Sequence, residues 1–300
     1  MKRREFLKTT AATSALATLG GASLSVSAHS GTNETQDVAC CDRTHATVQD
    51  AMKAPAETIA YVPAIYAGTG IQKPDYLATI DVDPKSADYG KVISRLEMPN
   101  VGDELHHFGW NACSSCHGKE GAGRRFIVLP GIASGRIHIV DTEDPRQPKL
   151  HKVIEPEVVK AKTGLSAPHT VHCLADGTVL ISMLGDSNGD APGGFMMMDS
   201  EFNILGRWEK DSTGMNFNYD YWYQPRHNVM ISSEWGAPNT VSQGFKLDDV
   251  KAGKYGRHLH FWNWQDRKIE QSIDLGENGL IPLEVRFHHN PDSTHGFVGA

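Results

Sequence analysis

Short apolar runs separated by polar turns recur along this chain at a nearly constant spacing. The run at 76–82 (YLATIDV) is followed by a turn and a second run at 91–97 (KVISRLE), which is the pattern of a β-hairpin. Equivalent hairpins start at residues 136, 194 and 258, so the spacing is 58 to 64 residues. A fixed period of this kind indicates a fold built from repeated supersecondary units.

A second type of hairpin lies between successive copies of the first. Its copies cover 169–182, 219–233 and 283–300, and a looser copy covers 106–129. Two hairpins per repeat make a four-stranded unit, which is the blade of a β-propeller. A β-sandwich with coincidental spacing is the alternative. We therefore predict an all-β fold of the propeller type.

The repeats amount to about four and a half blades, because the fifth unit reaches Ala300 after its second strand. A propeller closes on itself to hide its edge strands. We therefore expect a truncated sequence, with a propeller domain at 74–300 that is incomplete at its C-terminal end.

The first 28 residues have the composition of an export signal. Arg3 and Arg4 precede a run of small and apolar residues at 9–24. The paired arginines indicate the twin-arginine export machinery and a periplasmic or otherwise exported protein. An uncleaved membrane anchor is the alternative, although a span needs roughly 20 apolar residues. Residues 29–73 would then form an N-terminal segment leading into the propeller.

The predicted mature chain is moderately acidic. The formal net charge is −7, and removal of residues 1–28 takes away four basic residues and one acidic residue, which leaves about −10. An acidic surface repels polyanions. We therefore expect neither nucleic acid nor an anionic membrane as a partner, and no membrane span in the mature chain.

Histidines gather at the start of the innermost predicted strands. When the repeats are aligned by their turns, His106 and His107 open one blade and His169 and His172 open the next. The first strand of each propeller blade lines the central channel, so imidazoles from neighbouring blades can meet there. Imidazole binds copper, zinc, iron and nickel. We predict a metal site at these four residues, with ordinary core histidines as the alternative.

The cysteines are too few and too unevenly spaced for a disulfide framework. Cys113 and Cys116 form a C-x-x-C followed by His117, which matches the attachment pattern of c-type haem. The motif falls in a predicted hairpin turn and not on a helix. We therefore favour a disulfide or a redox-active thiol pair at Cys113 and Cys116 over haem. The sequence leaves open how these two pair with the other cysteines, Cys40, Cys41 and Cys173.

The string at 103–116 reads DELHHFGWNACSSC. It is similar to the signature of the family of selenium-binding proteins and methanethiol oxidases. The likeness runs from about Cys40 to the last residue. Further similar strings lie at 74–85, 148–156, 222–232 and 279–287.

The resemblance implies a seven-bladed propeller and a copper enzyme. Such an enzyme converts methanethiol, oxygen and water into formaldehyde, hydrogen sulfide and hydrogen peroxide. Histidines are the proposed metal ligands of the family, and the matching positions here are His106, His107 and His169, with His172 beside them. Another family histidine is expected beyond residue 300, so this chain would hold an incomplete site.

Two acidic residues open later inner strands and are predicted to lie at the same channel mouth. For Asp220 and Glu284 we predict proton transfer to and from a small thiol and oxygen, with plain channel-lining hydrogen bonds as the alternative. Two other functions stay open. The chain could be a non-catalytic thiol or selenium carrier that uses Cys113, Cys116 or Cys173, or an inactive truncated member of the family.

Overall fold

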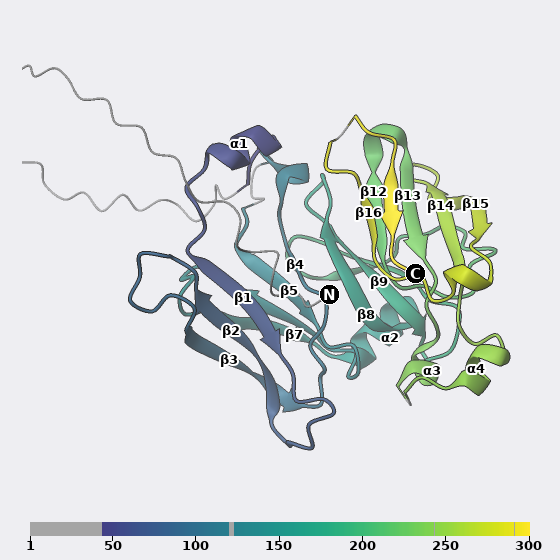
Figure 1. Ribbon diagram of the computed structural model, residues 1–300, viewed down its shortest axis with the longest axis horizontal. Helices are drawn as coiled ribbons and strands as arrows, with labels where there is room; N and C mark the ends of the chain where they lie inside the picture. Colours follow the sequence, from purple (N-terminus) through teal and green to yellow (C-terminus); the bar gives the residue numbers. More distant parts are fainter. Residues whose placement is uncertain (1–43, 120–122, 243, 291) are drawn as a thin grey trace, which may run out of the picture. The chain divides into compact units, whose positions relative to one another are not determined.

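The computed structural model describes residues 44–300 apart from 120–122, 243 and 291 (Figure 1). The predicted export signal at 1–28 lies outside the described residues. Within the described part of the chain, no helix has both the length and the apolar character that crossing a bilayer would require.

Antiparallel sheets contain almost all of the regular structure, and within each sheet every strand pairs with the next one in the chain. The first sheet consists of β1 (Ile59–Ala64), β2 (Pro74–Asp81) and β3 (Val92–Val101). The second consists of β4 (Gly109–Trp110), β5 (Phe126–Pro130), β6 (Ile137–Asp141) and β7 (Lys149–Ile154). The third consists of β8 (Leu165–Cys173), β9 (Val179–Asp186), β10 (Gly194–Met198) and β11 (Ile204–Arg207). The fourth consists of β12 (Tyr221–Gln224), β13 (Val229–Ser233), β14 (His258–Asn263) and β15 (Lys268–Asp274), and the fifth of β16 (Val285–Phe287) and β17 (Gly296–Val298).

Short helices occupy some of the connections. The α-helices are α1 (Val48–Lys53), α2 (Pro156–Thr163), α3 (Pro238–Val241) and α4 (Leu247–Lys251). Single 3₁₀ turns are η1 (Ser114–Cys116), η2 (Pro225–His227) and η3 (Glu277–Gly279). Helix α2 starts with a proline, whose fixed φ suits the first turn, and ends at Gly164, whose φ of 68° closes the helix.

Successive sheets bury their facing sides against each other, as propeller blades do. One cluster joins the second and third sheets through side chains such as Ile139, Ile181 and Met196. The next joins the third and fourth sheets through Phe195 and Trp262. Each fully buried side chain of this size stabilises the fold by about 1.5–3 kcal/mol. The prediction of an all-β, propeller-type fold is confirmed.

The first sheet includes a strand that precedes residue 74, where the propeller domain is predicted to begin. Strand β1 lies within the segment 29–73 and pairs with β2 from Ile59 onward. Pro63 interrupts the strand pattern in the sequence, because proline cannot donate a hydrogen bond to a neighbouring strand. Strand β1 tolerates Pro63 because it forms the edge of its sheet, where one side needs no partner.

Candidate metal centre

His106 and His107 lie in an extended segment between β3 and β4. Leu105 forms an isolated bridge to the residue after β5, and the backbone N–H of His106 donates to the carbonyl of Pro130 at 3.0 Å. Glu104, just before them, has a φ of 51°, which is uncommon for a residue with a side chain. The segment is therefore tied to the second sheet by its backbone, which leaves both imidazoles free to face inward.

His169 lies within β8 at a bulge. The register between β8 and β9 shifts between Pro168 and Val171, so His169 and Thr170 have no regular partner across the sheet. Ala167 also has a positive φ, of 53°. Bulges of this kind turn a side chain out of the regular alternation of a strand and are frequent beside active sites.

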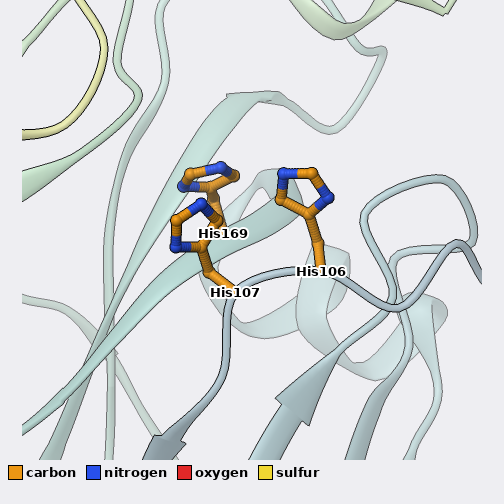
Figure 2. Close-up of side chains that lie close together, drawn as sticks. All are labelled: His106, His107 and His169. Carbon is orange, nitrogen blue, oxygen red and sulfur yellow. The ribbon is translucent and has the colours of Figure 1, made fainter. Parts of the chain in front are cut away.

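Strands β4 and β8 approach each other closely and bring the three imidazoles together. A Cβ added to Gly109 would lie 2.6 Å from the carbonyl oxygen of Val171, so a glycine is required there. The ring centroid of His169 lies 4.2 Å from that of His107 and 4.9 Å from that of His106. One ring nitrogen from each of the three histidines lies within 4.8 Å of the other two (Figure 2). The histidines therefore have the spacing of a metal site.

The hydrogen bonds around His169 determine which of its nitrogens can bind a metal. Nδ1 of His169 lies 2.9 Å from Oγ1 of Thr170, which lies 2.5 Å from Oδ1 of Asp220. A carboxylate only accepts, so the single hydroxyl proton of Thr170 goes to Asp220, and Nδ1 of His169 must be a donor. Nε2 then carries a lone pair. It is buried and has no hydrogen-bond partner among the described residues.

Burial favours the uncharged form of His106 and His169. Burial first, and then the neighbouring His107 and His106, hold the pKa of His169 well below its usual value. The pKa of His106 is also lowered, mainly by burial and then by His107. A neutral imidazole is the form that binds a metal ion.

His172 lies in a different environment. Its ring centroid lies 5.0 Å from that of Tyr221 and 4.5 Å from that of Trp222, and both contacts are edge-on. Burial lowers the pKa of His172 to about 4. The ring nitrogens that lie within 4.8 Å of one another belong to His106, His107 and His169, and His172 is not among them. The structure therefore removes His172 from the predicted ligand set.

Asp220 is fully buried, and both of its carboxylate oxygens are occupied. Oδ1 accepts from Thr170, and Oδ2 accepts from the backbone N–H of Val285 at 2.7 Å and from Arg286 at 2.5 Å. The Arg286 guanidinium also lies over the ring of Trp222, 4.9 Å from its centroid. Asp220 thus joins β8 to β12 and β16. This geometry suits the positioning of Thr170, and not the proton transfer predicted for Asp220.

Glu284 lies beside the cluster. Its Oε1 is 3.4 Å from Nε2 of His107, and its side chain is 40% exposed. A carboxylate that contacts both solvent and a site can carry protons between them. Of the two predicted acidic residues, Glu284 alone therefore has the access that proton transfer requires.

Thr170 and Arg286 contribute to the site but were not predicted from the sequence. A threonine has no metal-binding or proton-transfer signature of its own. The repeat alignment nevertheless contained a signal, because Thr170 occupies the place in its blade that His107, Asp220 and Glu284 occupy in theirs. All four are the second residue of the inner-strand opening, so that position faces the site in successive blades.

A cavity of about 590 Å³ adjoins His106. Ile132, Leu184 and Trp235 contribute apolar surface to it, and Val159 of α2 also lines it. Its volume falls within the range of about 300–1,000 Å³ that is usual for small-molecule sites. A small apolar substrate can therefore reach the edge of the histidine cluster.

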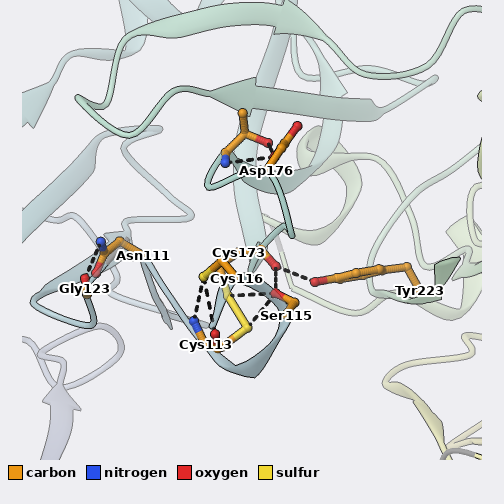
Figure 3. The surroundings of a disulfide bond; sticks show 9 residues. Asn111, Cys113, Ser115, Cys116, Gly123, Cys173, Asp176 and Tyr223 are labelled. Carbon is orange, nitrogen blue, oxygen red and sulfur yellow. Dashed lines mark hydrogen bonds between the residues drawn. A yellow bond between two sulfur atoms is a disulfide. The ribbon is translucent and has the colours of Figure 1, made fainter. Parts of the chain in front are cut away.

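Among the described residues, a disulfide joins the second sheet to the third (Figure 3). It links Cys113, in the loop after β4, to Cys173, the last residue of β8, with Cα atoms 6.4 Å apart. Cys116 is buried and carries a free thiol. The bond is therefore not within the C-x-x-C motif, and Cys113 has no thiol left for the attachment of haem.

The family model named "56kDa selenium binding protein (SBP56)" matches residues 39–300. The chain belongs to this family. The resemblance predicted from the sequence strings is thereby confirmed.

Two curated SBP56 relatives and one solved structure illustrate the similarity. A methanethiol oxidase of Xenopus laevis is 56% identical over 252 residues, and selenium-binding protein 1 of Arabidopsis thaliana is 56% identical over 258 residues. The crystal structure of a hypothetical selenium-binding protein from Sulfolobus tokodaii superposes with a TM-score of 0.82 at 46% identity. The superposition covers 85% of this chain and 56% of the Sulfolobus chain.

The chain spans about half the length of the curated relatives it matches. The alignments cover 83% and 85% of this chain but 53% of each of the two relatives. One of these relatives is named a methanethiol oxidase, and the other is named a selenium-binding protein.

Proposed function

We propose that this chain binds copper through His106, His107 and His169 and oxidises methanethiol there. The proposal rests mainly on the environment of the Nε2 atom of His169. It is a buried lone pair with no hydrogen-bond partner among the described residues, and two further imidazoles lie beside it. Buried polar atoms normally have a bonding partner, and a metal ion bound to Nε2 would supply one. The methanethiol oxidase name of the Xenopus relative supports the choice of reaction.

The chemistry favours copper over zinc, although three imidazoles can hold either metal. Copper stands highest among the divalent first-row metals in affinity. Oxidation of a thiol by oxygen needs a metal that changes its oxidation state, and zinc does not. Bound copper would supply this electron transfer and favour the thiolate form of the substrate.

The proposed overall reaction converts methanethiol, oxygen and water into formaldehyde, hydrogen sulfide and hydrogen peroxide. The cavity beside His106 admits the apolar substrate. Oε1 of Glu284 accepts the thiol proton, since this carboxylate is partly exposed and lies beside His107. The chain of Thr170 and Asp220 holds the ring of His169 with Nε2 unprotonated.

A copper titration of the metal-free chain tests the proposal directly. We expect one copper ion per chain, nitrogen hyperfine structure in its electron paramagnetic resonance spectrum, and methanethiol loss matched by sulfide release. The double variant His106→Ala/His107→Ala should lose all three signals. His227→Ala is the matched control, because His227 is exposed in η2, outside the cluster. Copper binding and turnover that survive in the double variant would remove this centre from the mechanism.

A thiol or selenium carrier is the second candidate, and the name of the Arabidopsis relative supports it. Cys116 is the free cysteine of the described residues, so a carrier would use this thiol. Selenite binding that is abolished by Cys116→Ser and unaffected by His106→Ala would favour the carrier. The reverse pattern would favour the copper centre.

We also propose that the chain acts outside the cytoplasm. The paired Arg3 and Arg4 support twin-arginine export, and the Cys113–Cys173 disulfide suits an oxidising compartment. Replacement of both arginines by lysine should retain the protein in the cytoplasmic fraction, whereas Lys2→Arg should not. Equal periplasmic yields of the two variants would contradict this route.

A further inference from the structure

The Cys113–Cys173 disulfide connects the two segments that carry the histidines of the candidate metal centre. His107 lies ahead of β4 and Cys113 lies after it, while His169 lies within β8 and Cys173 ends it. Between these ends, β4 and β8 lie so close at Gly109 that a Cβ added there would be 2.6 Å from the carbonyl oxygen of Val171. The disulfide therefore acts as a clamp at one end of a strand pair whose other end holds the imidazoles.

A third sulfur lies against this clamp. The backbone N–H of Cys113 lies 3.3 Å from Sγ of Cys116, and Sγ of Cys116 lies 3.3 Å from the carbonyl oxygen of Cys113 (Figure 3). The single 3₁₀ turn η1 holds the two residues in this arrangement. Cys116 therefore stays next to one half of the disulfide, with the backbone N–H of Cys113 directed at its sulfur.

The hydroxyl of Ser115 lies beside both sulfurs of the disulfide. Its Oγ is 3.0 Å from Sγ of Cys113 and 3.8 Å from Sγ of Cys173. A hydroxyl in this place can donate to a sulfur that leaves the disulfide as a thiolate. Tyr223 donates to the backbone carbonyl of Cys173, and the single proton of the Ser115 hydroxyl can go either to that carbonyl or to a leaving sulfur. The hydrogen bond from Tyr223 holds the end of β8 in place even without the disulfide.

We propose that Cys113, Cys116 and Cys173 form a thiol–disulfide exchange site. The Cys116 thiolate attacks Sγ of Cys113, the Cys113–Cys116 bond forms, and the Cys113–Cys173 bond breaks. Cys173 leaves as a thiolate, stabilised by Ser115, and takes up the proton that Cys116 released. The step conserves the number of disulfides, so it needs no external oxidant or reductant. A buried thiol can take part because its target is within the same turn.

The exchange opens the clamp between β4 and β8. In the Cys113–Cys116 form, only non-covalent contacts keep His107 near His169 at this end of the strand pair. We expect the open form to bind copper more weakly, an expectation that rests on the proposed function. The thiol–disulfide exchange itself does not rest on the proposed function, since no metal takes part in it.

Peptide mapping distinguishes the two disulfide forms. Cys113 and Cys116 fall on one tryptic peptide, 96–119, and Cys173 falls on another, 163–207. The protein carrying Cys40→Ser/Cys41→Ser is held under native conditions with iodoacetamide and then digested without reduction. We expect alkylated Cys173 to accumulate together with an internally bonded 96–119 peptide.

Two further variants make the mapping decisive. Cys116→Ser should show no alkylated Cys173 at any time, and Ser115→Ala should slow its appearance by about tenfold, since it removes a hydrogen bond to a charged leaving group. Alkylation of Cys116 alone, with the 96–119 and 163–207 peptides still fully cross-linked, would overturn the proposal. Circular dichroism of each variant checks that the sheets are retained.

Copper affinity tests the clamp separately. Cys116→Ser is locked in the closed form and Cys173→Ser in the open form, so we expect the first to bind copper about 5- to 150-fold more tightly, the usual range of coupling between two sites. Equal affinities would refute the coupling. Exchange without copper binding in any variant would instead refute the proposed metal centre and leave the exchange site standing.

Discussion

The hydrogen bond from His169 to Thr170 offers the sharpest test of the metal centre. Thr170→Val keeps the shape of the side chain and removes its oxygen. Nδ1 of His169 then loses its acceptor, and Oδ1 of Asp220 loses its donor. The ring of His169 is no longer held with its proton on Nδ1, so Nε2 is no longer kept free for a metal.

The magnitude follows from two costs. Removal of such an outer partner lowers metal affinity by about 10- to 100-fold, which corresponds to about 1.4–2.7 kcal/mol. Leaving a buried donor without an acceptor lowers the free energy of unfolding of the metal-free protein by about 1–3 kcal/mol. Both costs apply because His169 is fully buried and water cannot replace the hydroxyl of Thr170 there.

Competition titration with a copper chelator measures the affinity, and urea unfolding of the metal-free chain measures the stability. Thr170→Ser is the matched control, since it keeps the hydroxyl and should restore affinity to within about threefold. Nitrogen NMR of histidine should show His169 protonated on Nδ1 in the parent and in Thr170→Ser. A valine variant that binds copper as tightly as the serine variant would refute the reasoning.

Three further changes have defined outcomes. Glu284→Gln should lower kcat/KM for methanethiol by about 10²-fold through loss of a proton acceptor, with copper affinity unchanged; unchanged turnover would exclude Glu284. Because burial lowers the pKa of His172 to about 4, the unfolded chain takes up a proton below pH 6.5 that the folded chain rejects, so stability should fall by about 3 kcal/mol from pH 6.5 to pH 4. In His172→Phe, the free energy of unfolding should change less between pH 6.5 and pH 4. The same change as in the parent would contradict the lowered pKa of His172. Glu234 accepts from buried His260 at 2.9 Å, so Glu234→Ala should cost about 3 kcal/mol in urea unfolding, whereas a loss below 1 kcal/mol would show that the pair is dispensable.

Local alternation of apolar and polar residues was enough to predict most strands. The hairpins expected at 76, 136, 194 and 258 are present as β2–β3, β6–β7, β10–β11 and β14–β15. Strand β1 escaped prediction because Pro63 breaks the local pattern, and only its edge position makes it a strand. The alternation of apolar and polar residues depends on neighbours in sequence, whereas the edge position of a strand depends on how distant segments pair.

The histidine cluster was predicted in part because repeats place equivalent residues at equivalent positions. Alignment of the inner strands predicts that His106, His107 and His169 lie together. His172 is predicted with them because it is close to His169 in sequence, but the bulge at His169 and Thr170 breaks the alternation of the strand, so only the structure shows that His172 lies outside the cluster. The role of Asp220 could not be predicted, because its partners Thr170 and Arg286 are distant in the chain.

By itself, the sequence determined the blade repeats, the family and the residue types available to a metal. Tertiary structure alone decided which nitrogen of His169 is free and which cysteine Cys113 bonds. The reason is physical: a donor and an acceptor, or two sulfurs, interact through the distance and direction between them in space. Thr170 and Asp220 are 50 positions apart, and Cys113 and Cys173 are 60 positions apart. Only the packing of one sheet against the next brings such pairs within bonding distance.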